Sequence, residues 1–258
     1  MSRSPEDDVV ARLRAAGCVF AEDEAQLLLA EAGSAAALEE LVARRVAGEP
    51  LEHVLGWAEF CGLRVAVAPG VFVPRRRTEA LVEAAVGLGR PGAVVVDLCC
   101  GSGALGLAVA TSMPDVELHA ADVDPAAVAC AAANLADVGG HAHPGDLFAA
   151  LPADLRGRVD LLLANVPYVP SDAIALMPPE ARLHEARVAL DGGADGLDVA
   201  RRVIAGAPSW LAAGGSLFFE TSEAQAPVAV AAVTYAGLEP RVVTDDDRGA
   251  TVVVGTLA

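Results

Sequence analysis

The sequence Ala-Val-Val-Val-Asp-Leu-Cys-Cys-Gly-Ser-Gly at residues 93–103 decides the fold of this 258-residue chain. Its first six residues form a mostly apolar run of the kind that makes a buried strand. Glycines at 101 and 103 then permit a tight turn and let a ligand approach the backbone without a Cβ clash. A helix is predicted over 104–113, and Pro114 stops it. A strand, a glycine turn and a helix in this order are typical of a sheet that binds ligands at its strand ends.

Strand-like and helix-like stretches alternate from Pro74 onward. Further strands are predicted at 116–121, 159–164, 215–220, 241–243 and 251–254, and helices directly after Pro125 and over 197–213. This alternation predicts an α/β fold: a doubly wound, mainly parallel sheet with helices on both faces.

Three short amphipathic segments precede this region, around Leu13, Leu28 and Val42, with glycines between them. Their apolar spacing predicts helices. We therefore expect three parts: a helical domain over 1–50 that recognises the substrate, a β-hairpin linker over 51–73 with its turn at Cys61-Gly62, and a catalytic domain over 74–258.

Composition narrows the class of protein. Hydrophobic residues make up 54% of the chain, yet runs such as Ala93–Val96 are far too short to cross a bilayer. The first eight residues are charged and lack the apolar region of a secretory signal, so we expect a cytoplasmic protein without membrane contact. The five cysteines show no Cys-x-x-Cys spacing, which favours reduced thiols over a disulfide framework.

The net charge is −17, and every basic residue is arginine. An acidic surface repels phosphate backbones, so stable nucleic-acid binding is not expected. His141 and His143 have no third ligand nearby in the sequence, and His184-Glu185 lacks the second histidine of a zinc-binding helix. We expect the first two to be solvated loop residues, and we predict no metal site.

The cofactor is ambiguous from the strand ends alone. Asp122 ends the second strand, where its carboxylate could accept hydrogen bonds from both ribose hydroxyls of an adenosine. The run Gly101–Gly106 also fits a dinucleotide fingerprint, and Asp122 follows at the spacing of an NAD site. Asp97, placed before the glycine turn, favours S-adenosylmethionine. An NAD-dependent oxidoreductase remains the alternative at this stage.

A second motif follows the strand predicted at 159–164: Asn165-Val166-Pro167-Tyr168. A polar asparagine directly after a buried strand is costly unless it meets a partner. The carboxyl end of this strand also lies beside the cofactor. The motif is either an ordinary Asn-x-Pro turn or, beside the glycine turn of a cofactor site, a place where a polar side chain contacts a ligand.

With these motifs the chain resembles the protein-(glutamine-N5) methyltransferases, which modify peptide chain release factors. The resemblance rests on an ordered series of motifs: Leu55-Gly56 with Phe60, Pro74-Arg75 with Thr78-Glu79, Asp97 with Gly101-Ser102-Gly103, Asp122, Gly145–Phe148, Asn165 with Pro167-Tyr168, His184-Glu185, Ala189–Gly193, Asp195–Leu197, and Gly214-Gly215 before a strand that ends in Glu220.

The resemblance implies a Rossmann-like class I methyltransferase that binds S-adenosylmethionine and acts on a release factor glutamine. It implies cofactor-binding roles for Asp97, Cys99, Cys100, Gly101, Ser102, Gly103, Asp122, Asp146, Leu147 and Asn165, with Asp146 and Leu147 near the adenine. It also implies that Asn165, Val166, Pro167 and Tyr168 hold the substrate amide.

The chain departs from the family pattern at three positions. Val166 stands where the family has a proline, Cys99 replaces the first glycine of the cofactor turn, and Arg76 occupies another proline position. The alternative reaction is N-methylation of another protein, of a small molecule or of a nucleic-acid base amino group, for which related Asn-Pro-Pro-Tyr-type loops are used. A protein that has kept the cofactor-binding fold but catalyses no reaction is a further alternative function.

Overall fold

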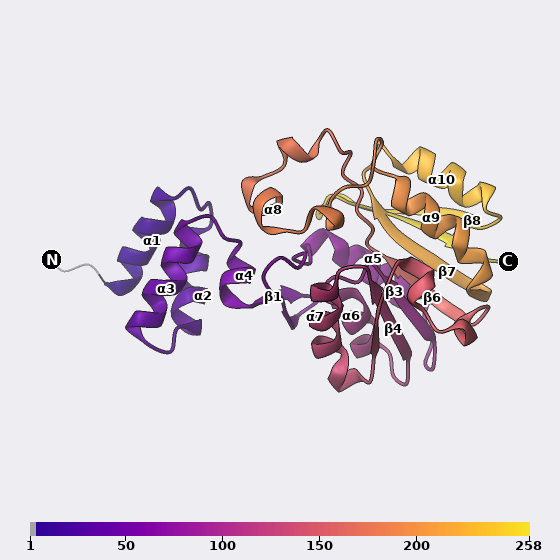
Figure 1. Cartoon of the computed structure of the whole chain (residues 1–258), viewed down its shortest axis with the longest axis horizontal. Coiled ribbons are helices and arrows are strands. Elements are labelled where there is room, and N and C mark those ends of the chain that lie inside the picture. The colour runs from indigo at the N-terminus through magenta and orange to yellow at the C-terminus, as the bar shows by residue number, and fades with distance from the viewer. Residues whose placement is uncertain (1–3) are drawn as a thin grey trace.

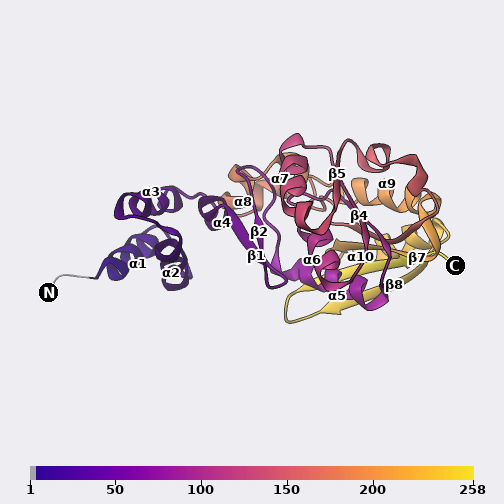
Figure 2. The same cartoon turned by 90° about the horizontal axis from the view of Figure 1, so that it is seen from below.

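A computed structural model describes residues 4–258 of the chain. At the N-terminus, three helices pack together: α1 (Pro5–Ala15), α2 (Ala21–Glu31) and α3 (Ala35–Val46). Leu13, Leu28 and Val42 meet in a small core of their own. In Figures 1 and 2 this bundle projects from one end of the molecule, away from the sheet.

A short helix and a hairpin lie between the bundle and the sheet. Helix α4 (Leu51–Leu55) adds Val54 and Leu55 to the core of the bundle, although we expected a linker there. Strands β1 (Trp57–Phe60) and β2 (Leu63–Ala66) form the expected hairpin. Its turn residues Cys61 and Gly62 have φ of 51° and 71°, the left-handed values that a two-residue hairpin turn requires. The exact division into domains stays a prediction.

One sheet of seven strands follows: β3 (Val94–Leu98), β4 (Glu117–Asp122), β5 (His141–Pro144), β6 (Val159–Ala164), β7 (Leu211–Thr221), β8 (Glu239–Asp245) and β9 (Ala250–Thr256). Their order is β5-β4-β3-β6-β7-β9-β8. In the sheet, β5, β4, β3, β6 and β7 are neighbours and run parallel to one another. Strand β9 runs antiparallel to both of its neighbours, β7 and β8. The predicted mainly parallel sheet is therefore confirmed.

Helices cover both faces of the sheet: α5 (Glu79–Leu88), α6 (Ala104–Ser112) and α7 (Pro125–Leu135) on one, and α9 (Asp198–Gly206) and α10 (Ala226–Tyr235) on the other. Leu81, Val109 and Leu135 belong to the first core, whereas Ile204 and Val233 belong to the second. Helix α8 (Pro179–His184) lies in the long connection between β6 and α9. The doubly wound arrangement thus follows the expected alternation.

Two local predictions are wrong. The segment that contains His141 and His143 is not a solvated loop but the edge strand β5, in which both rings lie about 5 Å from the ring of His119. The helix predicted over 197–213 ends at Gly206, because Pro208 lacks the backbone N–H that would continue it. Leu211–Ala213 belong to β7 instead.

The length and apolarity of the helices show whether any of them could span a membrane. Within residues 4–258, the helices are all too short or too polar to cross a bilayer.

Candidate active site

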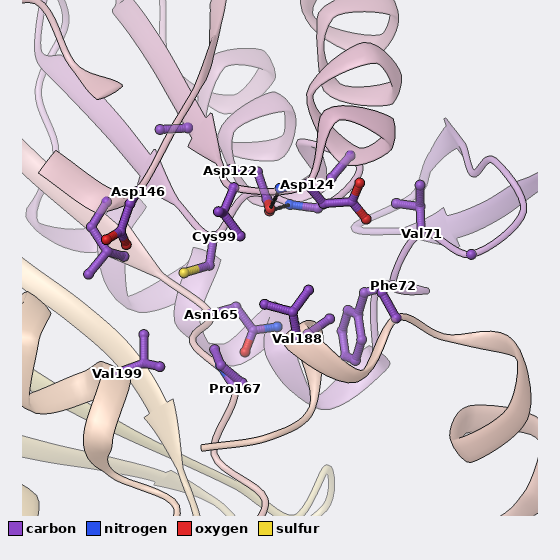
Figure 3. Close-up of a pocket in the computed structure, with 18 of the residues that line it drawn as sticks. Val71, Phe72, Cys99, Asp122, Asp124, Asp146, Asn165, Pro167, Val188 and Val199 are labelled. Carbon is purple, nitrogen blue, oxygen red and sulfur yellow. Dashed lines mark hydrogen bonds between the residues drawn. The ribbon is translucent and has the colours of Figure 1, made fainter. Parts of the chain in front are cut away.

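The chain adds β4 and β5 on one side of β3 and then returns to add β6 on the other side, so the strand order reverses between β3 and β6. Ligands of doubly wound folds bind outside the carboxyl ends of the strands at such a point. A cavity with about 780 Å³ of empty volume opens there. In Figure 3, Asp122 and Asp124 face Asn165 and Val188 across it.

The glycine turn after β3 forms one wall of the cavity. Cys99, Gly101 and Gly103 adopt left-handed backbone with φ of 55°, 54° and 76°. Cys99 and Gly101 line the cavity. Burial and the nearby Asp122 raise the pKa of the Cys99 thiol, so this sulfur stays neutral.

Three other residues of this turn do not line the cavity. A Cβ on Gly103 would lie 3.1 Å from the Cβ of Ala131, so this glycine lets α6 and α7 approach each other closely. Cys100 and Ser102 are buried. These positions shape the turn from behind rather than face a ligand.

Asp122 stands at the carboxyl end of β4. Its two carboxylate oxygens each accept one backbone hydrogen bond, from Gly101 N and Asp124 N, both at 2.9 Å. Burial raises the pKa of this carboxyl, and the two N–H donors oppose that shift. Each oxygen has a further lone pair, so the side chain can still accept from a diol in the cavity.

Asp97 lies elsewhere than the predicted cofactor role suggests. It is fully buried in β3, does not line the cavity, and accepts a 3.0 Å hydrogen bond from Gly106 N in α6. Its other oxygen, Oδ1, has no hydrogen-bond partner in the part of the chain that the structure describes. Burial raises the pKa of Asp97 to about 7. Its observed contact ties the strand to the helix behind the glycine turn.

Asp146 and Leu147 line the far end of the cavity, together with Val199 and Arg202. Arg202 pairs with Asp146 at 2.6 Å. No local motif predicts a role for Val199 or Arg202, because both come from α9, about fifty residues further along the chain.

Asn165 follows the last residue of β6, and its side chain lies at the cavity wall (Figure 3). Among the hydrogen bonds of residues 4–258, none involves the side-chain amide of Asn165, which is only half-buried. Both its donor and its acceptor are therefore available to a ligand.

A second hollow of about 360 Å³ adjoins the cavity. Asn165, Pro167, Phe72 and Ala189 line both spaces, whereas Val166 and Tyr168 line the second one only. Val166 is buried, with 2% of its surface exposed. The structure thus brings the four residues of the Asn165–Tyr168 motif together where two binding spaces meet.

The motif loop is supported by residues to which the sequence assigned no role. The Gln225 side chain donates to the backbone carbonyls of Tyr168 and Asp195, at 3.0 and 2.9 Å. Gly192 N donates to the carbonyl of Val169 at 2.9 Å. The segment 191–197 therefore packs against the motif loop and is hydrogen-bonded to it directly and through Gln225.

Comparison with known proteins gives consistent results. Residues 62–195 match the family model described as the methyltransferase small domain. A release factor glutamine methyltransferase of Geobacter sulfurreducens is 37% identical over 222 residues, which cover 85% of this chain and 77% of that protein. Another, from Cereibacter sphaeroides, is 38% identical over 251 residues, which cover 89% and 88%.

Solved structures agree at the level of the fold. The crystal structure of a methyltransferase from Pyrococcus furiosus aligns with a TM-score of 0.58 and 15% identity, over 83% of this chain and 96% of that one. A ribosomal protein L11 methylase from Lactobacillus delbrueckii subsp. bulgaricus aligns with a TM-score of 0.51 and 17% identity, over 71% and 81%.

Proposed function

The chain belongs to the release factor glutamine methyltransferase family, and on that premise we propose that it methylates a glutamine side-chain amide in a peptide chain release factor. The methyl donor would be S-adenosylmethionine, and the target the glutamine of the Gly-Gly-Gln loop. Membership of this family removes the oxidoreductase that the glycine fingerprint had left open.

The residues of the larger cavity fit this donor. Asp122 offers two acceptor oxygens for the ribose hydroxyls. We assign the adenine to the part of the same cavity lined by Asp146 and Leu147, as the family resemblance implies. When bound, S-adenosylmethionine supplies a methyl group on a positively charged sulfur. Asn165 and Pro167 line both spaces, so they separate this cavity from the smaller hollow, which we assign to the acceptor glutamine.

One observation carries the proposed reaction: the Asn165 amide, which has no hydrogen bond within residues 4–258, lies at the junction of the two spaces. An amide nitrogen is a poor nucleophile, because its lone pair is delocalised into the carbonyl. Two acceptors on its N–H bonds stabilise the positive charge that develops as it attacks, and they orient the lone pair. We assign these acceptors to the Asn165 side-chain oxygen and the Val166 carbonyl.

Pro167 and Val166 fit this assignment. A proline restricts the preceding residue to extended backbone, which helps to aim the Val166 carbonyl. Val166 in place of the usual proline keeps that carbonyl. No base is needed before transfer, since the methylated, cationic amide is strongly acidic and loses its proton afterwards.

The test is incubation with labelled S-adenosylmethionine and purified release factors, followed by mass spectrometry to locate the added methyl group. We expect label on the glutamine of the Gly-Gly-Gln loop. A release factor with asparagine at that position is the matched control and should stay unlabelled. Labelling elsewhere, or none, would contradict the proposed target. The net charge of −17 gives no support to a nucleic-acid target.

A further inference from the structure

Two buried carboxylates lie near the smaller hollow assigned to the substrate glutamine, called the acceptor hollow below, without lining it. The side chains of Glu185 and Glu220 are 1% and 2% exposed. Glu185 pairs with Arg75 at 2.6 Å, and Glu220 pairs with Arg77 at 2.7 Å. Buried carboxylates are costly unless they are paired and hydrogen-bonded, so these two pairs need a reason to be there.

Each arginine also contacts an aromatic ring. The Arg75 guanidinium lies 4.9 Å from the ring centroid of Phe72, and that of Arg77 lies 5.7 Å from the ring centroid of Tyr168. Both distances fall within the range of cation–π contacts. Phe72, Tyr168 and both arginines line the acceptor hollow. Two chains of contact therefore lead from a buried carboxylate, through an arginine, to a ring at that hollow.

The hydroxyl of Tyr168 makes two hydrogen bonds within its chain of contacts. It donates to Glu220 Oε1 at 2.6 Å and accepts from Arg77 Nη2 at 2.5 Å. Thr78 Oγ1 donates to the other oxygen of Glu220 at 2.6 Å. Because its proton is committed to Glu220, the Tyr168 hydroxyl does not donate to the substrate glutamine, and the ring is the part of Tyr168 that we assign to the wall of the hollow.

Glu185 anchors its side of the hollow through one oxygen, while its Oε2 has no hydrogen-bond partner within residues 4–258. Its Oε1 accepts from Val73 N at 3.1 Å as well as from Arg75. The next residue, Ala186, donates through its backbone N–H to the Gly70 carbonyl at 3.2 Å. These bonds join the chain on either side of Phe72 to the segment that carries Ala189 into both spaces.

We infer that Glu185 and Glu220 are positioning residues for methyl transfer: through Arg75 and Arg77 they hold the rings of Phe72 and Tyr168 as walls of the acceptor hollow. They also neutralise the two guanidinium groups. Positive charge develops on the attacking nitrogen, and an unbalanced arginine beside it would oppose the transition state. This inference rests on the proposed function.

The test uses Glu220→Gln, which keeps the shape of the side chain and removes its charge, together with Tyr168→Phe, which keeps the ring and removes its anchor. Both act on one chain of contacts. We expect each to lower kcat for release factor methylation about tenfold, since loss of positioning is costly, while KM and the Kd of S-adenosylmethionine change less than about threefold. The double variant should fall no further than the worse single variant, because residues in one network are not additive.

Glu223→Gln is the matched control. Glu223 lies three residues beyond Glu220, is exposed, and forms no side-chain bond among the described residues. Its kcat should equal that of the wild type. Glu185→Gln combined with Phe72→Leu tests the second chain in the same way.

Unchanged kcat in Glu220→Gln, or additive losses in the double variant, would overturn the inference. If Glu220→Gln does not fold, as judged by the loss of a cooperative thermal transition, Tyr168→Phe decides alone, and wild-type kcat in that variant overturns the role of the anchor. A wild-type enzyme that methylates no release factor contradicts the proposed function, and the inference falls with it. An active wild type with an indifferent Glu220→Gln contradicts the inference only.

Discussion

Gly192 lies directly against Pro167: a Cβ atom at position 192 would stand 2.6 Å from the Pro167 carbonyl oxygen. The backbone of the Asn165–Tyr168 motif thus packs against the segment that contains Gly192. Gln225 joins the same two segments, because its side chain donates to the carbonyls of Tyr168 and Asp195. The conformation of the Asn165–Tyr168 motif depends on this close approach of two backbones.

Gly192→Ala should therefore impair the loop. The added methyl group must displace both the Pro167 carbonyl and that of Gly196, each of which it would meet at 2.6 Å. We expect a loss of about 1–3 kcal/mol in the free energy of unfolding, as for other overpacked sites, and a lower kcat. Urea unfolding and single-turnover methylation measure the two effects.

Gly33→Ala is the control, because a Cβ there meets nothing within 4 Å and, as at Gly192, the backbone is not left-handed. Equal stability and equal kcat in both variants would show that the close approach is unimportant.

Asn165→Ala should abolish transfer while leaving cofactor binding nearly intact, because its side chain is the proposed acceptor for the substrate N–H. A positioned contact of this kind is typically worth about 10²–10³ in rate. Methylation kinetics give the first quantity, and calorimetry with S-adenosylmethionine gives the second. Near-normal turnover would rule out the assignment of Asn165.

Asp122→Ala should weaken S-adenosylmethionine binding. Loss of hydrogen bonds to a charged acceptor costs about 1.5–3 kcal/mol, or roughly 10- to 100-fold in Kd. Calorimetry measures the change. Asp137→Ala removes an exposed charge that does not line the cavity and should leave Kd unchanged. An equal Kd in the two variants would refute the role of Asp122 in cofactor binding.

Asp97 should make stability depend on pH. Its carboxyl has an ordinary pKa of 3.8, which burial raises to about 7 in the folded chain. Between these values the unfolded chain binds fewer protons than the folded one, so a rise in pH favours unfolding. Asp97→Asn removes this effect and should gain stability relative to the wild type as the pH rises from about 4 to 7.

Urea unfolding at about pH 5 and pH 7.5 measures this difference. Asp195→Asn serves as control: Arg201 holds the pKa of Asp195 at about 2, so its effect should be flat over the same interval. A constant difference between Asp97→Asn and the wild type would mean that Asp97 is already ionised in the folded protein.

Much of the fold could be read from local patterns. The apolar run before Cys99 and the glycines after it predict a strand, a turn and a helix, and the structure has all three. Strand β5 was missed because its sequence, His-Ala-His-Pro, carries no apolar period, and an edge strand needs little burial. The helix before β7 was predicted too long, because apolar residues after Pro208 fit either a helix or a strand.

The sequence by itself determined where the strands before the glycine turn and before Asn165 end, since strand and turn signals act over only a few neighbouring positions. It thereby placed Asp122 and Asn165 at one edge of a parallel sheet. Only the tertiary structure decided that Asp97 lies behind the turn, and that Phe72, Tyr168, Glu185 and Glu220 are joined through two arginines at one hollow. The pairing of buried charges depends on which distant segments pack together, and no local pattern encodes that choice.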